Sequence, residues 1–393
     1  MSMPVFPLKH NNEMYLLINL LPNALTIRYN TRLYRSSWFT STLNMLAAQP
    51  SSQNIAIVRF SALGDVVLMV PAVHALRRSF PEATLTWVTS PLAFSLLRDL
   101  EGVNFIVCDK PRSLADYRSF YRAFRQRSFD VVLAMQANLR INLLYPALHA
   151  PLKIGFDRTR AREGQWLFCN RRIPFANSHL ADSFLAFAAE LGADSSKIEW
   201  NLPIAEADHA WAQAQLKHLP RPLIALHPCA SKQERNWIFE RYAETMQKAS
   251  SKWQAGFVLT GGNSHAEKDF CARLTTIAPA HCLNLCGQTT TKQLAALLAQ
   301  ADVLIAPDTG AVHLARAMNT PVIGLYAVVS PTLSGPYAAQ QYVINRYPDA
   351  VRKYLGKDPD RLPWNTRVHH ADAMSLIQTE EVIAQLSQIF AAK

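Results

Sequence analysis

Four loops of this chain combine residue types that can move a proton or bind phosphate, and each follows an apolar run. The first, Ser61-Ala62-Leu63-Gly64-Asp65, places a carboxylate directly after a glycine. Asp65 can cap the helix that follows, a role for which aspartate is well suited. It can also act as a general base that takes a proton from the hydroxyl group of a substrate. The residues around Asp65 leave both roles open.

The second loop, Pro307-Asp308-Thr309-Gly310-Ala311-Val312-His313, leads into a stretch that we expect to be helical. Backbone N–H groups at a helix N-terminus can bind a diphosphate, and a glycine there lets the ligand approach closely. Thr309 can add a hydroxyl donor, whereas Asp308 can either cap the helix or bind sugar hydroxyls. His313 lies one turn into the helix, where it can face a phosphate or be a structural residue.

The remaining two loops carry cations and glycines. The loop 227–237 contains Lys232 and Arg235. Their charges can neutralise a departing nucleotide diphosphate, or they can belong to a solvated loop. The loop 260–267 contains Gly261, which can serve a turn or let a nucleotide approach the backbone.

The segments between these loops alternate between apolar runs and helical stretches. Near-continuous apolar runs are typical of parallel strands that are covered on both faces, and their alternation with helices indicates a doubly wound sheet. The pattern starts at Asn54 and restarts near residue 222. We expect strands at 54–60, 84–89, 105–108, 130–135, 223–227, 257–260, 303–306 and 321–326.

The fold class that follows is α/β, with two Rossmann-like doubly wound domains facing a central cleft. Residues 1–53 form an N-terminal extension, 54–205 the first domain and 206–393 the second, whose last helix could pack back on the first. Ligands of open α/β sheets bind at the carboxyl ends of the strands. All four loops are expected at such ends.

Charge and cysteine content indicate which binding partners and which cellular compartment suit this protein. The 40 Lys and Arg residues outnumber the 29 Asp and Glu residues, which suits a nucleotide, a nucleic acid or an anionic membrane surface. The six cysteines show no zinc-binding spacing, and reduced thiols in a reducing compartment are the expected state. No secretory signal or membrane-spanning run is evident, so we expect a cytoplasmic protein.

Taken together, the four loops resemble the lipopolysaccharide heptosyltransferases, a family of ADP-heptose-dependent glycosyltransferases (family 9) with the GT-B fold. The resemblance covers about residues 54–392. The segment from Arg59 to Asp65 resembles the family's R-x-S-x-x-G-D motif. The segment His227-Pro228-Cys229-Ala230-Ser231, followed by Arg235-Asn236-Trp237, resembles its H-P-G-A-S and K-x-W motifs, and Asp308 to Ala315 resembles its D-[ST]-G-x-x-H-x-A box.

This resemblance implies roles for individual residues. Asp65 becomes the base, and Arg235 takes the place of a lysine near the donor phosphates; these two are the catalytic candidates. The implied donor-binding residues are Ser231, Lys232, Gly261, Asp308, Thr309, Gly310 and His313. The implied acceptor-binding residues are Arg59, Ser61 and Gly64, and no residue is assigned to a metal. The chain departs from the family where Cys229 replaces glycine and where Arg235 replaces lysine, which changes the geometry of the charge.

The implied reaction is an inverting transfer of heptose from ADP-heptose to the inner core of lipopolysaccharide. It requires no cofactor, although a divalent cation could assist. The implied partners are an ADP-sugar donor, an anionic glycolipid acceptor (Kdo-lipid A or core oligosaccharide) and, by peripheral contact, the inner membrane; no nucleic-acid module is present. The alternatives are a relative that uses another nucleotide sugar or a protein acceptor, and a non-catalytic nucleotide-sugar-binding protein.

Overall fold

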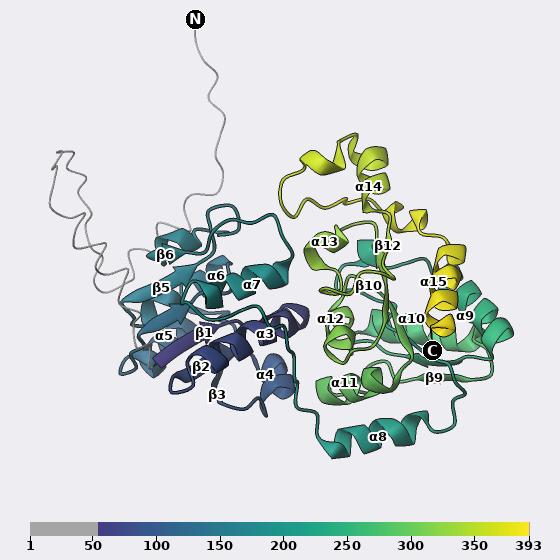
Figure 1. Cartoon of the computed structure of the whole chain (residues 1–393), viewed down its shortest axis with the longest axis horizontal. Coiled ribbons are helices and arrows are strands. Elements are labelled where there is room, and N and C mark those ends of the chain that lie inside the picture. Colours follow the sequence, from purple (N-terminus) through teal and green to yellow (C-terminus); the bar gives the residue numbers. More distant parts are fainter. Residues whose placement is uncertain (1–53, 393) are drawn as a thin grey trace, which may run out of the picture. The chain divides into compact units, whose positions relative to one another are not determined.

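The computed structural model describes residues 54–392. The expected N-terminal extension, residues 1–53, lies outside the described residues. Within them the chain forms two parallel six-stranded sheets with helices on their faces (Figure 1). The α/β class and the two doubly wound sheets that we expected from the sequence are confirmed.

The first sheet has the strand order β3-β2-β1-β4-β5-β6. Its central strand β1 pairs in parallel with β2 and β4, and its Ile55 lies opposite both Leu85 and Val131. The apolar residues of β1 are completely buried because helices cover both faces of the sheet. The strands are β1 (Asn54–Val58), β2 (Thr84–Thr89), β3 (Val103–Val107), β4 (Val131–Leu133), β5 (Leu152–Gly155) and β6 (Arg171–Arg172).

The helices of this half are α3 (Leu63–Ser79), α4 (Pro91–Leu97), α5 (Leu114–Phe124), α6 (Leu139–Asn142) and α7 (Leu180–Ala189). Local sequence explains where several of them begin. Ser90 caps α4 and is followed by a proline at the first helical position, where the missing N–H has no intrahelical partner. Ser113 caps α5, and Asp116 returns a hydrogen bond to the backbone N–H of Ser113, which completes a capping box.

The second sheet has the strand order β12-β11-β10-β7-β8-β9. The central strands β10 and β7 are buried along their whole length, as the apolar runs predicted. The strands are β7 (Leu223–Leu226), β8 (Gly256–Leu259), β9 (Cys282–Asn284), β10 (Val303–Pro307), β11 (Val322–Tyr326) and β12 (Ile344–Asn345). The helices are α8 (Glu206–Leu216), α9 (Phe239–Trp253), α10 (His265–Ile277), α11 (Thr291–Gln300), α12 (Gly310–Ala317), α13 (Pro331–Ser334), α14 (Tyr347–Ala350) and α15 (Thr379–Ala391).

The last helix, α15, packs within the second half. Its buried residues Val382, Leu386 and Ile389 join the apolar cluster around β7 and β10, and the helix contacts α9 and β11. The sequence had left open that this helix packs back on the first half. The structure shows instead that its apolar face is covered by the second sheet and α9.

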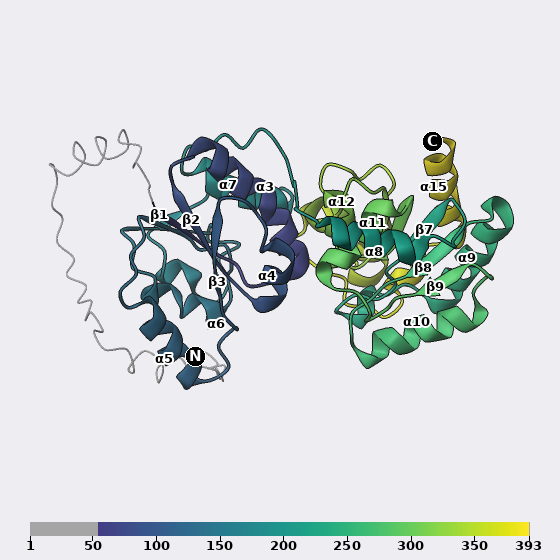
Figure 2. The ribbon, with the colours of Figure 1, turned by 90° about the horizontal axis from the view of Figure 1, so that it is seen from below.

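The two halves share an apolar core and specific polar contacts. α3 contacts α12, and α4 contacts α11 (Figures 1 and 2). A hydroxyl–hydroxyl contact of 2.9 Å joins Ser95 to Thr291, and the ammonium group of Lys292 forms an ion pair with Asp99. None of the helices formed by residues 54–392 is both long enough and apolar enough to cross a membrane.

Candidate active site

The N-termini of α3 and α12 meet where the two halves touch. A Cβ atom added to Gly64 would lie 2.6 Å from Cδ2 of His313 and 3.2 Å from the Cα atom of Gly310. Ordinary carbon contacts are about 3.5–4.0 Å, so glycine at position 64 allows the two helices to approach this closely. The first and second of the loops expected to carry chemistry are therefore adjacent in space.

Asp65 occupies the third position of α3. Its Oδ2 atom accepts a hydrogen bond of 3.2 Å from the backbone N–H of Ala62, so its role at the helix N-terminus is observed. The carboxylate also keeps 26% of its side chain exposed, which leaves it reachable by a substrate. Helix capping and proton transfer are thus compatible at this position.

Arg59 lies beyond the end of β1 and forms an ion pair with the carboxylate of Asp65. Its Nη1 atom donates to the carbonyl oxygen of Met135 at 2.6 Å, and its guanidinium carbon lies 5.2 Å from the centre of the Phe184 ring. The residue is only 9% exposed. The structure therefore places the charge of Arg59 against Asp65, a partnership that the sequence analysis did not anticipate.

Asp308 and Arg235 form a second ion pair, from two loops at the carboxyl edge of the second sheet. Nη1 of Arg235 lies 2.9 Å from Oδ2 of Asp308, and Ser334 donates to the other carboxylate oxygen at 3.2 Å. Burial raises the pKa of Asp308, and the charge of Arg235 opposes that rise. Nε of Arg235 is buried and has no hydrogen-bond partner among the described residues.

Thr309 and His313 complete the loop at the start of α12. The hydroxyl oxygen of Thr309 accepts a hydrogen bond of 3.1 Å from the N–H of Ala311 and so caps the helix. His313 is 6% exposed, and its Nδ1 atom has no partner among the described residues. Burial lowers the pKa of His313 to about 4, with a smaller contribution of the same sign from the charge of His179. His313 is therefore neutral near pH 7, and its buried Nδ1 atom lacks a hydrogen-bond partner among the described residues.

The other donor-binding candidates differ in their surroundings. Ser231 and Lys232 are exposed, and their side chains form no hydrogen bond or ion pair with another candidate within residues 54–392. An added Cβ at Gly261 would lie 2.6 Å from Sγ of Cys286. Glycine at position 261 therefore has a packing reason as well as the ligand-binding reason that we expected.

Ser61 borders a basic pocket that the sequence analysis missed. The pocket has a volume of about 320 Å³ and lies at the carboxyl edge of the first sheet, between loops that follow β1, β2, β3 and β4. Its cationic lining residues are Lys110, Arg112 and Arg140. Burial lowers the pKa of Lys110, and the positive charges of Arg140 and Arg59 lower it further. Three cationic side chains and one carboxylate, Asp109, thus line the pocket, and the excess of positive charge favours an anionic ligand.

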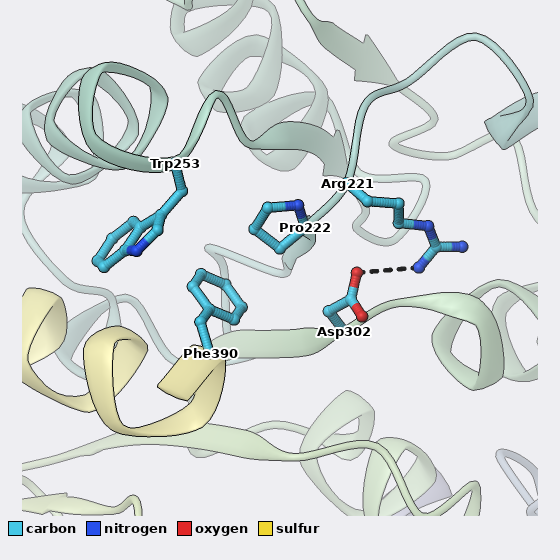
Figure 3. Close-up of a pocket in the computed structure, with 5 residues that line it drawn as sticks. All are labelled: Arg221, Pro222, Trp253, Asp302 and Phe390. Atoms are coloured by element: carbon cyan, nitrogen blue, oxygen red, sulfur yellow. Dashed lines mark hydrogen bonds and ion pairs between the residues drawn. The ribbon is translucent and has the colours of Figure 1, made fainter. Parts of the chain in front are cut away.

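A larger pocket of about 560 Å³ lies elsewhere on the second half (Figure 3). Pro222, Trp253 and Phe390 line it, and an ion pair of 3.0 Å joins Arg221 to Asp302 at its side. Pro222 and Asp302 directly precede β7 and β10, so this pocket lies at the amino edge of the sheet. Ligands of such sheets bind at the opposite edge, and we therefore do not assign the pocket to the active site.

Metal-binding side chains are not clustered in the part of the chain that the structure describes. No group of three or more His, Cys, Asp or Glu side chains within residues 54–392 is arranged to bind a metal ion. The candidate site is therefore composed of two ion pairs, a neutral histidine, two helix N-termini and a basic pocket.

Known proteins resemble this chain in sequence over most of its length. Residues 117–355 match the family model described as glycosyltransferase family 9 (heptosyltransferase). The lipopolysaccharide core heptosyltransferase OpsX of Haemophilus influenzae is 33% identical over 339 residues, which are 86% of this chain and 97% of that protein.

Solved structures of glycosyltransferases share the fold. A family 9 glycosyltransferase from Veillonella parvula superposes with a TM-score of 0.71 at 20% identity, over 87% of this chain and 98% of that one. The E. coli heptosyltransferase WaaC superposes with a TM-score of 0.65 at 21% identity when bound to ADP, over 85% of this chain and 99% of that one. Its structure with ADP-2-deoxy-2-fluoro heptose gives 0.63 at 22% identity, with the same coverage. The expected GT-B fold is confirmed, and the chain belongs to the glycosyltransferase family 9 of heptosyltransferases.

Proposed function

We propose that this chain transfers heptose from ADP-heptose to the inner core of lipopolysaccharide, with inversion at the anomeric carbon. The relative OpsX is named for the lipopolysaccharide core, and WaaC has been solved with ADP and with an analogue of ADP-heptose. The observation that carries the proposal is the contact between Gly64 and the α12 loop. It brings the candidate base of one half beside the candidate donor loop of the other.

In the proposed reaction Asp65 takes the proton of the acceptor hydroxyl group as its oxygen attacks the anomeric carbon. The attack comes from the face opposite the ADP, so the new bond has the inverted configuration. Arg59 holds the carboxylate in place through its ion pair and does not need to touch the acceptor. A positioned base of this kind typically accelerates a reaction by about 10²- to 10⁴-fold.

The donor would bind at the carboxyl edge of the second sheet. The backbone N–H groups of Gly310 and its neighbours at the start of α12 would bind the diphosphate, as helix N-termini do. His313 is neutral there and can hydrogen-bond to a phosphate or sugar oxygen through its unpartnered nitrogen. Arg235 would stabilise the charge that develops on ADP as the bond to the sugar breaks. Asp308 and Thr309 would contact the sugar, and Ser231, Lys232 and Gly261 would border the nucleotide.

The acceptor would bind in the first half, with Ser61 and Gly64 next to the reacting hydroxyl group. The basic pocket of Lys110, Arg112 and Arg140 lies beside Ser61 and suits a carboxylate or phosphate of the acceptor. Kdo-lipid A and core oligosaccharides carry such groups. Residues 54–205 would thus form the acceptor domain, and the donor domain would begin at about residue 206.

The proposed reaction assigns no step to a cofactor. A divalent cation bound together with the donor diphosphate is compatible with it, and transfer assays with and without a chelator test that point. We further propose that the chain works at the cytoplasmic face of the inner membrane, because its acceptor would be a membrane lipid.

The decisive experiment compares two aspartates in the same helical position. Asp65 and Asp116 each occupy the third position of a helix and each accept a backbone N–H from the N-cap residue. Asp65→Asn should lower kcat for heptosyl transfer at least about 100-fold while the Kd for ADP stays unchanged. Asp116→Asn also removes one negative charge from the third position of a helix, the exposed N-terminus of α5. This variant should keep wild-type kcat. Equal kcat values for the two variants would contradict the assignment of the base.

A further inference from the structure

Large apolar side chains that remain exposed are concentrated in the first half of the chain. Seven of the eight such residues within 54–392 precede residue 206. Isolated exposed apolar residues are common, but a group of them on one edge marks an interaction surface. Four lie in segments that follow β4, β5 and β6: Leu139 (38% exposed), Trp166 (49%), Leu167 (59%) and Phe175 (52%). We call these four residues the apolar rim.

Hydrogen bonds connect the segments that carry the apolar rim. The backbone N–H of Leu139 donates to Oε2 of Glu163 at 2.5 Å, and the amide of Asn142 donates to the carbonyl oxygen of Glu163 at 2.9 Å. Trp166 follows Glu163 by three residues. Since β4, β5 and β6 are neighbours in the sheet, their carboxyl ends lie along one edge. The segments that carry the rim therefore leave the sheet along one edge.

Buried polar contacts hold the rim in its exposed position. Gln165, next to Trp166, is completely buried and donates to a backbone carbonyl just after β4 at 2.7 Å. Arg160 is 3% exposed and donates to the carbonyl oxygen of Pro174 at 2.6 Å. Its guanidinium carbon also lies 5.7 Å from the centre of the Phe175 ring. The buried side chains of Gln165 and Arg160 thus fix the backbone next to Trp166 and Phe175, whose side chains remain exposed.

The segments of the apolar rim carry three exposed arginines and one exposed carboxylate, Glu163. Arg140, Arg158 and Arg162 are exposed, and none of them forms an ion pair with a carboxylate in the part of the chain that the structure describes. Tryptophan and phenylalanine partition into the interface of a bilayer, and arginine side chains reach from there to lipid phosphates. Each arginine near an anionic bilayer also gains electrostatic attraction. The combination matches an anionic lipid surface in both polarity and charge.

We propose that the apolar rim docks on an anionic phospholipid bilayer. The inference rests on the proposed function, because a lipid-linked acceptor has to reach the basic pocket from a membrane. Arg140 lines that pocket and directly follows Leu139 of the rim. A bilayer bound to the rim therefore places lipid head groups near the pocket that Ser61 borders.

The test is sedimentation of the full-length protein with two kinds of vesicle. One is pure phosphatidylcholine, and the other mixes phosphatidylcholine with phosphatidylglycerol. The wild-type protein should partition onto the mixed vesicles more strongly. A variant with both Trp166→Ser and Leu167→Ser should partition at least about tenfold less, because two large apolar groups no longer insert. A variant with both Arg158→Ser and Arg162→Ser should lose about fivefold for each arginine.

A second basic surface supplies the control for charge alone. Arg122 and Arg125 lie at the end of α5, just before β4 begins, so they lie toward the amino edge of the sheet, away from the rim. A variant with both Arg122→Ser and Arg125→Ser removes the same charge and should keep wild-type partitioning. If it loses as much binding as the Arg158/Arg162 variant, or if the Trp166/Leu167 variant binds normally, the proposal is wrong.

Fluorescence locates the contact more directly. Vesicles with brominated acyl chains should quench tryptophan emission in the wild-type protein, and Trp166→Phe should abolish that quenching but not the binding. Binding of single-stranded RNA that the Trp166/Leu167 variant loses, without any binding to vesicles, would assign the surface to nucleic acid and overturn the proposal. Transfer to a deacylated acceptor separates this inference from the proposed function. The Trp166/Leu167 variant should keep kcat, and Asp65→Asn should lose kcat yet still bind vesicles.

Discussion

Substitution of Gly64 by alanine should separate the two halves of the active site. Neither Gly64 nor Gly310 has a positive φ, so the backbone at both positions accepts alanine without strain. The added Cβ at position 64 would lie 2.6 Å from Cδ2 of His313. Carbon atoms in contact lie about 3.5–4.0 Å apart, and the overlap is therefore about 1 Å. Either the His313 ring or the N-termini of the two helices have to move by a similar amount.

A shift of this size has a calculable effect on catalysis. Misplacement of reacting groups by about 1 Å can lower a rate about 100-fold. Gly64→Ala should therefore lower kcat about 100-fold while the free energy of unfolding falls by about 1–3 kcal/mol, as is usual for overpacking. Gly310→Ala is the matched comparison, because its added Cβ would lie 3.2 Å from the backbone nitrogen of Gly64. The smaller overlap there should lower kcat less than about tenfold.

The assay is steady-state transfer from ADP-heptose to a deacylated acceptor, with urea denaturation to measure stability. ADP affinity should fall as well in Gly64→Ala, because the added Cβ displaces the His313 ring that borders the proposed donor site. A Gly64→Ala variant with wild-type kcat would refute the view that this close approach aligns the base with the donor. So would a Gly310→Ala variant that loses more activity than Gly64→Ala.

Other consequences follow from buried charges. Arg235→Met leaves the largely buried carboxylate of Asp308 without its cation and should lower the free energy of unfolding by about 2–3 kcal/mol in urea titrations; adding Asp308→Asn should restore part of that loss. The pKa of His313 is lowered from 6.5 to about 4, so the unfolded state binds more protons between these pH values. Stability should therefore be complete above about pH 6.5 and fall by about 3 kcal/mol toward pH 4, and the dependence should be flatter in His313→Gln. Burial raises the pKa of Cys229 to about 12, so iodoacetamide near pH 7 should leave this thiol unlabelled in the folded protein, as mass spectrometry would show.

The central strands could be predicted from the sequence because burial on both faces makes them continuously apolar. The expected strands at 84–89 and 303–306 agree with β2 (Thr84–Thr89) and β10 (Val303–Pro307) to within one residue. The two-residue edge strands β6 and β12 carry no such signal, unlike the longer edge strand β3, which the sequence analysis expected at 105–108. β6 consists of two arginines, Arg171–Arg172, and β12 of Ile344–Asn345, and neither has an apolar run to reveal it.

The candidate site was predictable in its loops but not in its partnerships. The position of Asp65 after a buried strand and of Asp308 before a helix follows from local patterns. The Arg235–Asp308 ion pair joins residues that are 73 positions apart, and only the tertiary fold brings them together. The ion pair between Arg59 and Asp65 also depends on the tertiary fold. From the sequence alone, the guanidinium group of Arg59 can contact either a ligand or Asp65. Lys110 and Arg140 lie in polar segments without a recognisable motif. They line the same pocket because the strands that precede them belong to the same sheet.

The most direct test of the proposed function is the stereochemistry of the transfer itself. Purified protein would be incubated with ADP-heptose and Kdo-lipid A, and the product linkage would be determined by NMR. The predicted result is one added heptose whose anomeric configuration is opposite to that of the donor, with ADP released in equal amount. Retention of the donor configuration, or transfer only from another nucleotide sugar, would contradict the proposed reaction.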